Sequence, residues 1–421
     1  MKINKFICAT LLTSVTFAGA ATAQGSKLLT TYTQIAHAAF TDSLNTAQAL
    51  SSAVDQLVAN PSEASLINAR TAWLASRVPY QQTEVYRFGN AIVDDWEGRV
   101  NAWPLDEGLI DYVDASYGQD SQSNMLYTAN VIANPKLKIG GREIDASNIT
   151  PALLQDALHE AGGSESNVAT GYHAIEFLLW GQDLNGTNAG AGNRQYTDFD
   201  TKNCSNANCD RRAQYLQAAT TLLVSDLAEM VANWTADGAA VKQLEDAGEV
   251  SAINTMLTGM GSLSYGELAG ERIRLGLMLN DPEEEHDCFS DNTHNSHFYD
   301  ALGVQNVYLG QYTRTSGEIY QGASLSAHVA AIDKALDAEM QQDLANSVAA
   351  MQVMVARAEA GEAYDQMIGE GNTEGNAVIQ ATVDTLVKQT RTMERIVSVL
   401  GLSAVEIAGS DSLDNPNAVF Q

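Results

Sequence analysis

The chain has 421 residues, and 52 acidic against 23 basic side chains give it a formal charge of −29. Such a charge repels phosphate backbones and anionic lipid, which argues against nucleic-acid and membrane-surface binding and favours cations as partners. Only 7 residues are proline, 45% are hydrophobic, and mean hydropathy is −0.16, which together indicate a folded chain rich in long helices.

The N-terminus has the pattern of an export signal. Lys2 and Lys5 precede a mostly apolar stretch from residue 6 to residue 20, and Ala21-Thr22-Ala23 is a typical cleavage site. Residues 1–23 are therefore predicted to be a signal peptide, removed on export to a bacterial periplasm or to the cell surface. No later apolar run is long enough to span a bilayer, so we expect no transmembrane segment in the mature chain.

Helical spacing of apolar residues recurs along most of the remaining chain. The first half shows it at 28–58, 62–78 and 151–158, and again up to Trp180, where Gly181 ends the pattern. The segment 185–209 is rich in Gly, Asn and Thr, which indicates a boundary. Beyond that segment the helical patterns cover 210–236, 249–258, 264–279, 325–360 and 376–400.

These patterns predict an all-α fold, because no segment alternates apolar and polar residues long enough to require a large sheet. We expect two helical-bundle domains of similar size, an N-terminal one over 24–195 and a C-terminal one over 196–421. Similar halves would be consistent with a duplication, although no exact sequence repeat is visible.

The predicted export determines how the cysteines are interpreted. Cys8 leaves with the signal peptide, and three cysteines remain. Cys204 and Cys209 flank a short polar loop in an oxidising compartment, which predicts a local disulfide. Cys288 is then the odd cysteine, and we expect it to be a buried or half-buried thiol.

The segment with the greatest density of chemical groups is 171–183. On a helix, His173 and Glu176 are three residues apart and share one face, and Trp180 lies on that face too. An imidazole and a carboxylate among apolar neighbours need partners when they are buried, and a metal ion would satisfy both. The alternative is an intrahelical hydrogen bond that only supports the bundle.

A second group of metal-ligating types lies between residues 267 and 297. Glu283 and His286 match one Glu-x-x-His element of a di-iron bundle, but the required second element is missing. Five residues are nevertheless candidate accessory ligands: Glu267, Glu271, His286, Asp291 and His294. The alternative is that this part of the chain is a solvated, charged connection between helices.

The string Gly171-x-His173-x-x-Glu176, continued by residues 177–181, resembles the GxHxxE signature of the imelysin family. The resemblance extends over essentially the whole mature chain. It includes Trp73, Arg77, Tyr80 and Glu84, the Trp-Pro-x-Asp element at 103–106, and two segments, 266–272 and 281–294, that are similar to the iron-regulated protein A branch.

The resemblance implies an exported, all-α protein with a role in iron acquisition. Carried over residue by residue, it implies one metal site lined by Glu84, Asp106, His173 and Glu176. Three carboxylates and one imidazole suit iron, with zinc as the other candidate. The implied partners are a metal ion or chelate and a membrane iron transporter. Ordinary salt bridges to nearby arginines are the alternative for Glu84 and Asp106.

Two other functions stay open. The family also carries a peptidase label, so a metallopeptidase using His173 and Glu176 is the first alternative. The His-Glu-x-x-His motif is absent, and Phe177 occupies the position of the second histidine in the inverted motif. A non-catalytic binding protein is therefore favoured over an enzyme. The second alternative is a module that captures a protein or chelate ligand in a cleft between the domains.

Overall fold

The computed structural model describes residues 18–118, 121, 124–139 and 141–420. Residues 1–17 of the predicted signal peptide, including Cys8, lie outside the described residues. Within the described part, no helix has both the length and the apolar character needed to cross a membrane.

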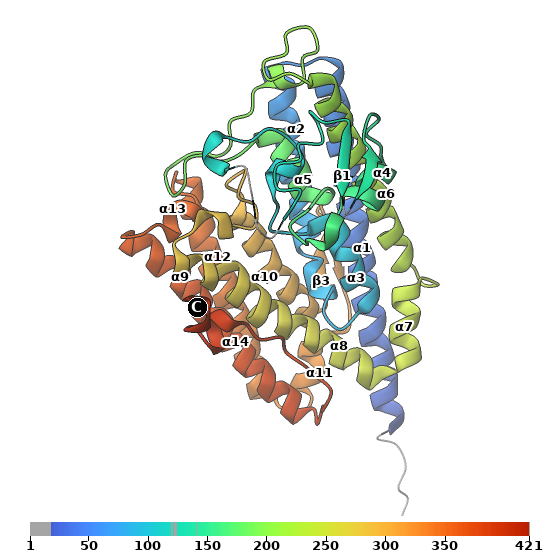
Figure 1. Ribbon diagram of the computed structural model, residues 1–421. Helices are drawn as coiled ribbons and strands as arrows, with labels where there is room; N and C mark the ends of the chain where they lie inside the picture. The colour runs from blue at the N-terminus through green and yellow to red at the C-terminus, as the bar shows by residue number, and fades with distance from the viewer. Residues whose placement is uncertain (1–17, 119–120, 122–123, 140, 421) are drawn as a thin grey trace, which may run out of the picture.

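The described chain is built of packed helices with two small hairpins (Figure 1). The long helices are α1 (Ala18–Ala59), α2 (Glu63–Gln81), α3 (Ala91–Asn101), α5 (Gly171–Trp180), α6 (Cys209–Asn233), α8 (Glu249–Ser262), α10 (Thr293–Leu309), α12 (Lys334–Glu359) and α14 (Thr373–Val399). The shorter ones are α4 (Pro151–Leu153), α7 (Ala239–Ala247), α9 (Leu275–Leu279), α11 (Leu325–Ala330), α13 (Tyr364–Ile368) and α15 (Asp411–Asp414). A π-helical stretch, Leu263–Arg274, joins α8 to α9.

The strands form two antiparallel hairpins. β1 (Lys136–Ile139) pairs with β2 (Arg142–Asp145), with Lys136 opposite Asp145. β3 (Gln311–Thr313) pairs with β4 (Ile319–Gln321), with Gln311 opposite Gln321. Because the described strands are so short, the predicted all-α fold class is confirmed.

The larger core lies around α1, which packs along α2 and α6. Aromatic rings fill it: Phe40 packs against Trp96 and Trp234, with ring centroids 5.9 and 6.2 Å apart. A smaller core, with members between Leu268 and Leu386, lies where the π-helical stretch and α12 pack against α14. Helix α2 also packs against α10, and this contact joins the N-terminal helices to the second half of the chain.

The domain boundary between residues 195 and 196 stays a prediction, as does the duplication. Helix α6 lies on the C-terminal side of that boundary in sequence, yet it packs against α1 and α5 on the N-terminal side. In Figure 1, α6 and α7 run beside α1, while α9, α12 and α14 lie on the opposite side of the molecule.

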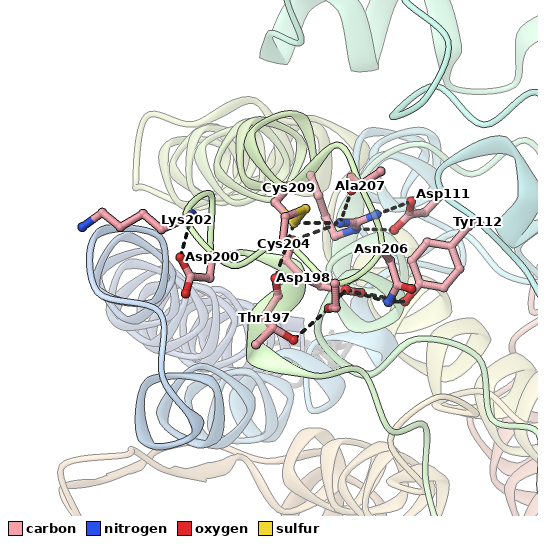
Figure 2. The surroundings of a disulfide bond; sticks show 12 residues. Asp111, Tyr112, Thr197, Asp198, Asp200, Lys202, Cys204, Asn206, Ala207 and Cys209 are labelled. Carbon is pink, nitrogen blue, oxygen red and sulfur yellow. Dashed lines mark hydrogen bonds and ion pairs between the residues drawn. A yellow bond between two sulfur atoms is a disulfide. The ribbon is translucent and has the colours of Figure 1, made fainter.

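The predicted disulfide is confirmed: it joins Cys204, in the loop before α6, to Cys209, the first residue of α6. Figure 2 shows that this loop lies against Asp111. Arg212, at the start of α6, donates to both oxygens of Asp111 at 2.6 and 3.0 Å, and Arg194 donates to the same carboxylate at 2.8 Å. These buried ion pairs fix the loop to the segment that follows the Trp-Pro-x-Asp element.

Candidate metal centre

Helix α5 carries the candidate pair, and its position is set by close contacts. Gly171 begins the helix with φ +79°, and a Cβ there would lie 2.4 Å from the carbonyl oxygen of Val100. From the other side, Trp73 of α2 donates its indole N–H to the carbonyl of Tyr172 at 2.9 Å. Only glycine permits this approach to α3, so the glycine of the motif has a packing role.

His173 and Glu176 form a buried pair. His173 is 1% exposed and Glu176 is 0% exposed, and Nδ1 of the histidine lies 3.1 Å from Oε2 of the glutamate. The other oxygen, Oε1, accepts two hydrogen bonds from Ser290, from its N–H at 3.0 Å and its hydroxyl at 2.6 Å. Both oxygens of Glu176 are therefore occupied, whereas Nε2 of His173 is buried without a hydrogen-bond partner.

His286 and Asp287 complete the centre from a distant part of the sequence. Among the described residues, the group of three or more metal-ligating side chains that can offer atoms within 4.8 Å of one another is His173, His286 and Asp287. Oδ1 of Asp287 lies 3.6 Å from Nδ1 of His286 and 3.9 Å from Nδ1 of His173. All three side chains are buried.

Asp287 is held firmly in this position. Arg77 of α2 contacts both of its oxygens, at 2.7 and 3.3 Å. Asn292 and Ser296 donate to Oδ2 at 2.7 and 2.5 Å. A centre fixed by so many hydrogen bonds is ordered before any ligand binds.

The protonation states suit metal ligation. Burial, reinforced by Arg77, lowers the pKa of His173 to about 3, and burial lowers the pKa of His286 well below its usual value. Burial opposes ionisation of Asp287, but Arg77 outweighs it and the net shift of this pKa is downward. Two neutral imidazoles and one carboxylate are the forms that bind a metal. Burial, followed by the charge of Asp287, raises the pKa of Glu176 well above its usual value.

A pocket of about 210 Å³ reaches His286 from the surface. Glu160 and Glu165 are exposed at this pocket, and Glu97 and Glu267 line it further in, together with Arg87 and Arg272. Carboxylates at the opening raise the local concentration of cations.

The structure does not place Glu84 and Asp106 in the same group as His173. Glu84 is buried and accepts a hydrogen bond from Arg272 at 2.8 Å. Asp106 accepts from the amide of Asn124 at 2.5 Å. Neither carboxylate is among the described residues whose ligand atoms lie within 4.8 Å of those of His173 and His286, and the four-ligand set stays a prediction.

The accessory candidates lie in different surroundings. Glu267 pairs with Arg272 at 2.8 Å, and Glu271 is exposed beside the C-terminal segment. Only His286 belongs to the centre. Asp291 and His294 each have a buried side-chain atom without a partner, Oδ1 and Nδ1 respectively.

Sequence reasoning missed Asp287, Arg77 and Ser290 as members of the centre. Asp287 directly follows a candidate histidine, and the family resemblance includes Arg77 and the segment 281–294, but neither signal gave these residues a place in the centre. Arg77 lies 210 positions before Asp287 and Ser290 lies 114 positions after Glu176, so only the fold brings these residues together.

The comparisons with known proteins agree on the fold. The family model described as Imelysin matches residues 36–393. Two solved structures are similar. A protein described as an iron-regulated protein A precursor, from Parabacteroides distasonis ATCC 8503, has a TM-score of 0.64 at 19% identity, over 90% of this chain and 95% of that one. An imelysin-like protein from Psychrobacter arcticum 273-4 has a TM-score of 0.57 at 16% identity, over 90% and 97% of the two chains. No curated protein matches the sequence.

Proposed function

Since the chain belongs to the imelysin family, we propose that it is an exported protein that binds iron as cargo in iron acquisition. One of its structural neighbours is described as iron-regulated, which supports this direction. In the proposal, His173, His286 and Asp287 supply the ligands. The protein would act in the periplasm and pass the metal, free or as a chelate, to a membrane transporter.

The observation that carries the proposal is the unpartnered Nε2 of His173. A buried polar atom without a partner costs about 1 to 3 kcal/mol. With Nδ1 engaged by Glu176, Nε2 is the nitrogen left for a metal ion. A metal bond at this atom would remove the cost, and the neighbouring His286 and Asp287 are the right types to share the ion.

The donor set favours iron. Two imidazoles and one carboxylate that leave other positions open are the pattern of non-haem ferrous sites. Zinc can use the same set, so it is the natural competitor. The mixed donors are less suited to calcium or magnesium, which prefer oxygen alone.

Glu176 would orient the metal ligand rather than bind the metal. A carboxylate that accepts the second N–H of a ligating histidine fixes the ring and raises its basicity. The positive charge of a bound metal ion would favour the ionised form of Glu176, which burial and the charge of Asp287 oppose. The hydrogen bonds from Ser290 hold Glu176 for this task. This role differs from the ligand role that the family resemblance implies for it. It also supports binding over a metallopeptidase, because a carboxylate with both oxygens engaged is a poor general base.

The test is a calorimetric titration of the chain without residues 1–23, stripped with chelator, with ferrous iron under anaerobic conditions and zinc as competitor. We expect one ion per chain, no measurable binding by His173→Ala, and an affinity 10 to 100 times weaker for Glu176→Gln. His328→Ala is the matched control, since His328 of α11 lies outside the centre. Equal iron binding by His173→Ala and His328→Ala would refute the proposal, and chelator-sensitive peptide hydrolysis lost in Glu176→Gln would favour the peptidase.

A further inference from the structure

The pocket that leads to His286 limits what can reach the candidate metal centre. Its volume is about 210 Å³, and its lining comes from α3, from the π-helical stretch and from the segment between α4 and α5. His286 itself is 1% exposed, and the pocket gives a ligand a route to it from the surface. Trp103 also lines the pocket, and its ring centre lies 5.9 Å from that of His286.

The volume of this pocket fits a hydrated metal ion and little more. Six water molecules around an octahedral ion occupy roughly 180 Å³ at the volume that water has in the liquid. Organic ligands of drug size need cavities of about 300 to 1,000 Å³. Haem, or iron wrapped in a large organic chelator, is therefore too big to reach His286 through this pocket.

The arginines of the pocket are already engaged by carboxylates of the protein. Arg272 pairs with Glu84 at 2.8 Å and with Asp300 at 3.1 Å. Arg87 pairs with Asp94 at 2.9 Å and lies 3.7 Å from Glu84. Anionic ligands such as carboxylates and phosphates are usually bound by arginine side chains that are free to pair with them. A small, negatively charged iron chelate would not find such a partner in either arginine.

Two glutamates lie at the opening of the pocket. Glu160 and Glu165 are both exposed, and both belong to the segment between α4 and α5. Exposed carboxylates attract cations and repel anions over a distance of about 10 Å at 0.1 M salt. The entrance to the centre thus discriminates by charge as well as by size.

We propose that the centre takes up iron as the free, hydrated ferrous ion, which enters past Glu160 and Glu165, and that this entrance excludes haem and anionic iron chelates. The inference rests on the proposed function, since it concerns the same centre, and it narrows the incoming cargo to the free ion. Glu160 and Glu165 speed the entry of the ion without binding it permanently. The strength of binding then depends on His173, His286 and Asp287.

The test is stopped-flow mixing of ferrous iron, without oxygen, with chelator-stripped protein that lacks residues 1–23. Quenching of tryptophan fluorescence reports the arrival of the ion, because the ring of Trp103 lies close to that of His286. In Glu160→Gln/Glu165→Gln we expect the association rate constant to fall about threefold or more at low salt, with an unchanged dissociation rate constant. At about 1 M salt this difference should disappear.

Two controls accompany the rate measurement. The double variant Glu245→Gln/Asp246→Asn removes the same charge from exposed positions on α7, and its association rate constant should stay near that of the parent. Ferric citrate in excess citrate, and haem, should each give no saturable quenching that is lost in His173→Ala.

The outcomes separate this inference from the function on which it rests. If the parent binds ferrous iron but the two double variants associate at the same rate, the entrance does not steer the ion and the inference is wrong. Saturable binding of ferric citrate or haem that requires His173 would also overturn it, while leaving the metal centre in place. No ferrous binding by the parent would refute the proposed function itself, and this inference with it.

Discussion

Arg77 sets the charge of the candidate metal centre. Its guanidinium pairs with Asp287 at 2.7 Å, donates to Asn101 at 2.7 Å, and lies 4.9 Å from the ring centre of Tyr172. It supplies the positive charge that keeps a fully buried Asp287 ionised. A metal ion at the centre would supply positive charge to the same carboxylate.

Because Arg77 and a metal ion would supply positive charge to the same carboxylate, we expect the ion to compensate in part for the loss of Arg77. Arg77→Met should lower the free energy of unfolding by about 3 to 5 kcal/mol, because it leaves the buried Asp287 without its partner. Saturating ferrous iron should recover part of the loss, since the ion neutralises the same charge. Urea unfolding with and without iron measures both effects.

The control for Arg77→Met is Arg395→Met, whose ion pair with Glu339 is exposed, so that its loss should leave the free energy of unfolding nearly unchanged. A loss in Arg77→Met that is identical with and without iron would contradict the compensation.

Glu107 provides a prediction about pH. Burial, together with the charge of Glu283, raises the pKa of Glu107 to about 7. In the unfolded chain this carboxyl ionises near its ordinary value, so the folded state loses stability as pH rises from that value through about 7. Glu107→Gln cannot ionise and should escape this loss. The free energy of unfolding of Glu107→Gln, taken relative to that of the parent, should rise by about 2 to 3 kcal/mol from pH 5 to pH 8.

Urea unfolding at the two pH values, in chelator, measures this gain. The exposed Glu63→Gln should show no such gain, because water solvates its charge. A difference between Glu107→Gln and parent that is the same at both pH values would show that Glu107 is already ionised in the fold.

Among the residues of the centre, His173 and Glu176 could be predicted as a pair on one helix face, because their spacing and their apolar neighbours are local features of the sequence. The sequence could not predict the roles of their partners. Whether Glu176 binds a metal or orients a ligand depends on Ser290, which reaches it from another part of the chain. Likewise, the pairing of Glu84 with Arg272 joins residues 188 positions apart.

Helix α5 depends on the glycine that begins it. Gly171→Ala would combine a left-handed backbone, φ +79°, with a clash against the carbonyl of Val100. We expect a loss of stability on the order of 3 kcal/mol or more. Gly118→Ala is the control, because φ there is +89° and no atom lies within 4 Å of the added carbon. It should lose only about 1 kcal/mol of backbone strain.

Chemical unfolding of the two glycine variants separates strain from packing. Equal losses would show that α5 and α3 can move apart, and that the glycine does not fix the position of His173.

Helices with an apolar stripe were predicted well. The pattern at 376–400 corresponds to α14 (Thr373–Val399). Helix α10 was missed because its buried face carries polar groups, among them Ser296, His297 and Asp300, so no apolar stripe marks it. The pattern at 325–360 gave one helix, but the chain turns between α11 and α12, where Asp333 caps the second helix. The two hairpins are too short to show a period.

For the molecule as a whole, composition and helical periodicity together predicted the helical fold, since scarce proline and helical spacing extend along the entire chain. The assembly of the centre needs long-range packing. Helix α5 brings His173 and Glu176, α2 brings Arg77, and a loop more than 100 residues further on brings His286 and Asp287. A metal ion at this point would tie the N-terminal helices to the second half of the chain.

The most direct measurement is an anomalous difference map from crystals of the chain without residues 1–23, grown with ferrous iron in the absence of oxygen, with data collected on both sides of the iron absorption edge. The account predicts an iron peak in contact with His173, His286 and Asp287, at bond lengths of about 2.1 Å. No peak at this position, or a peak between Glu84 and Asp106 instead, would contradict it.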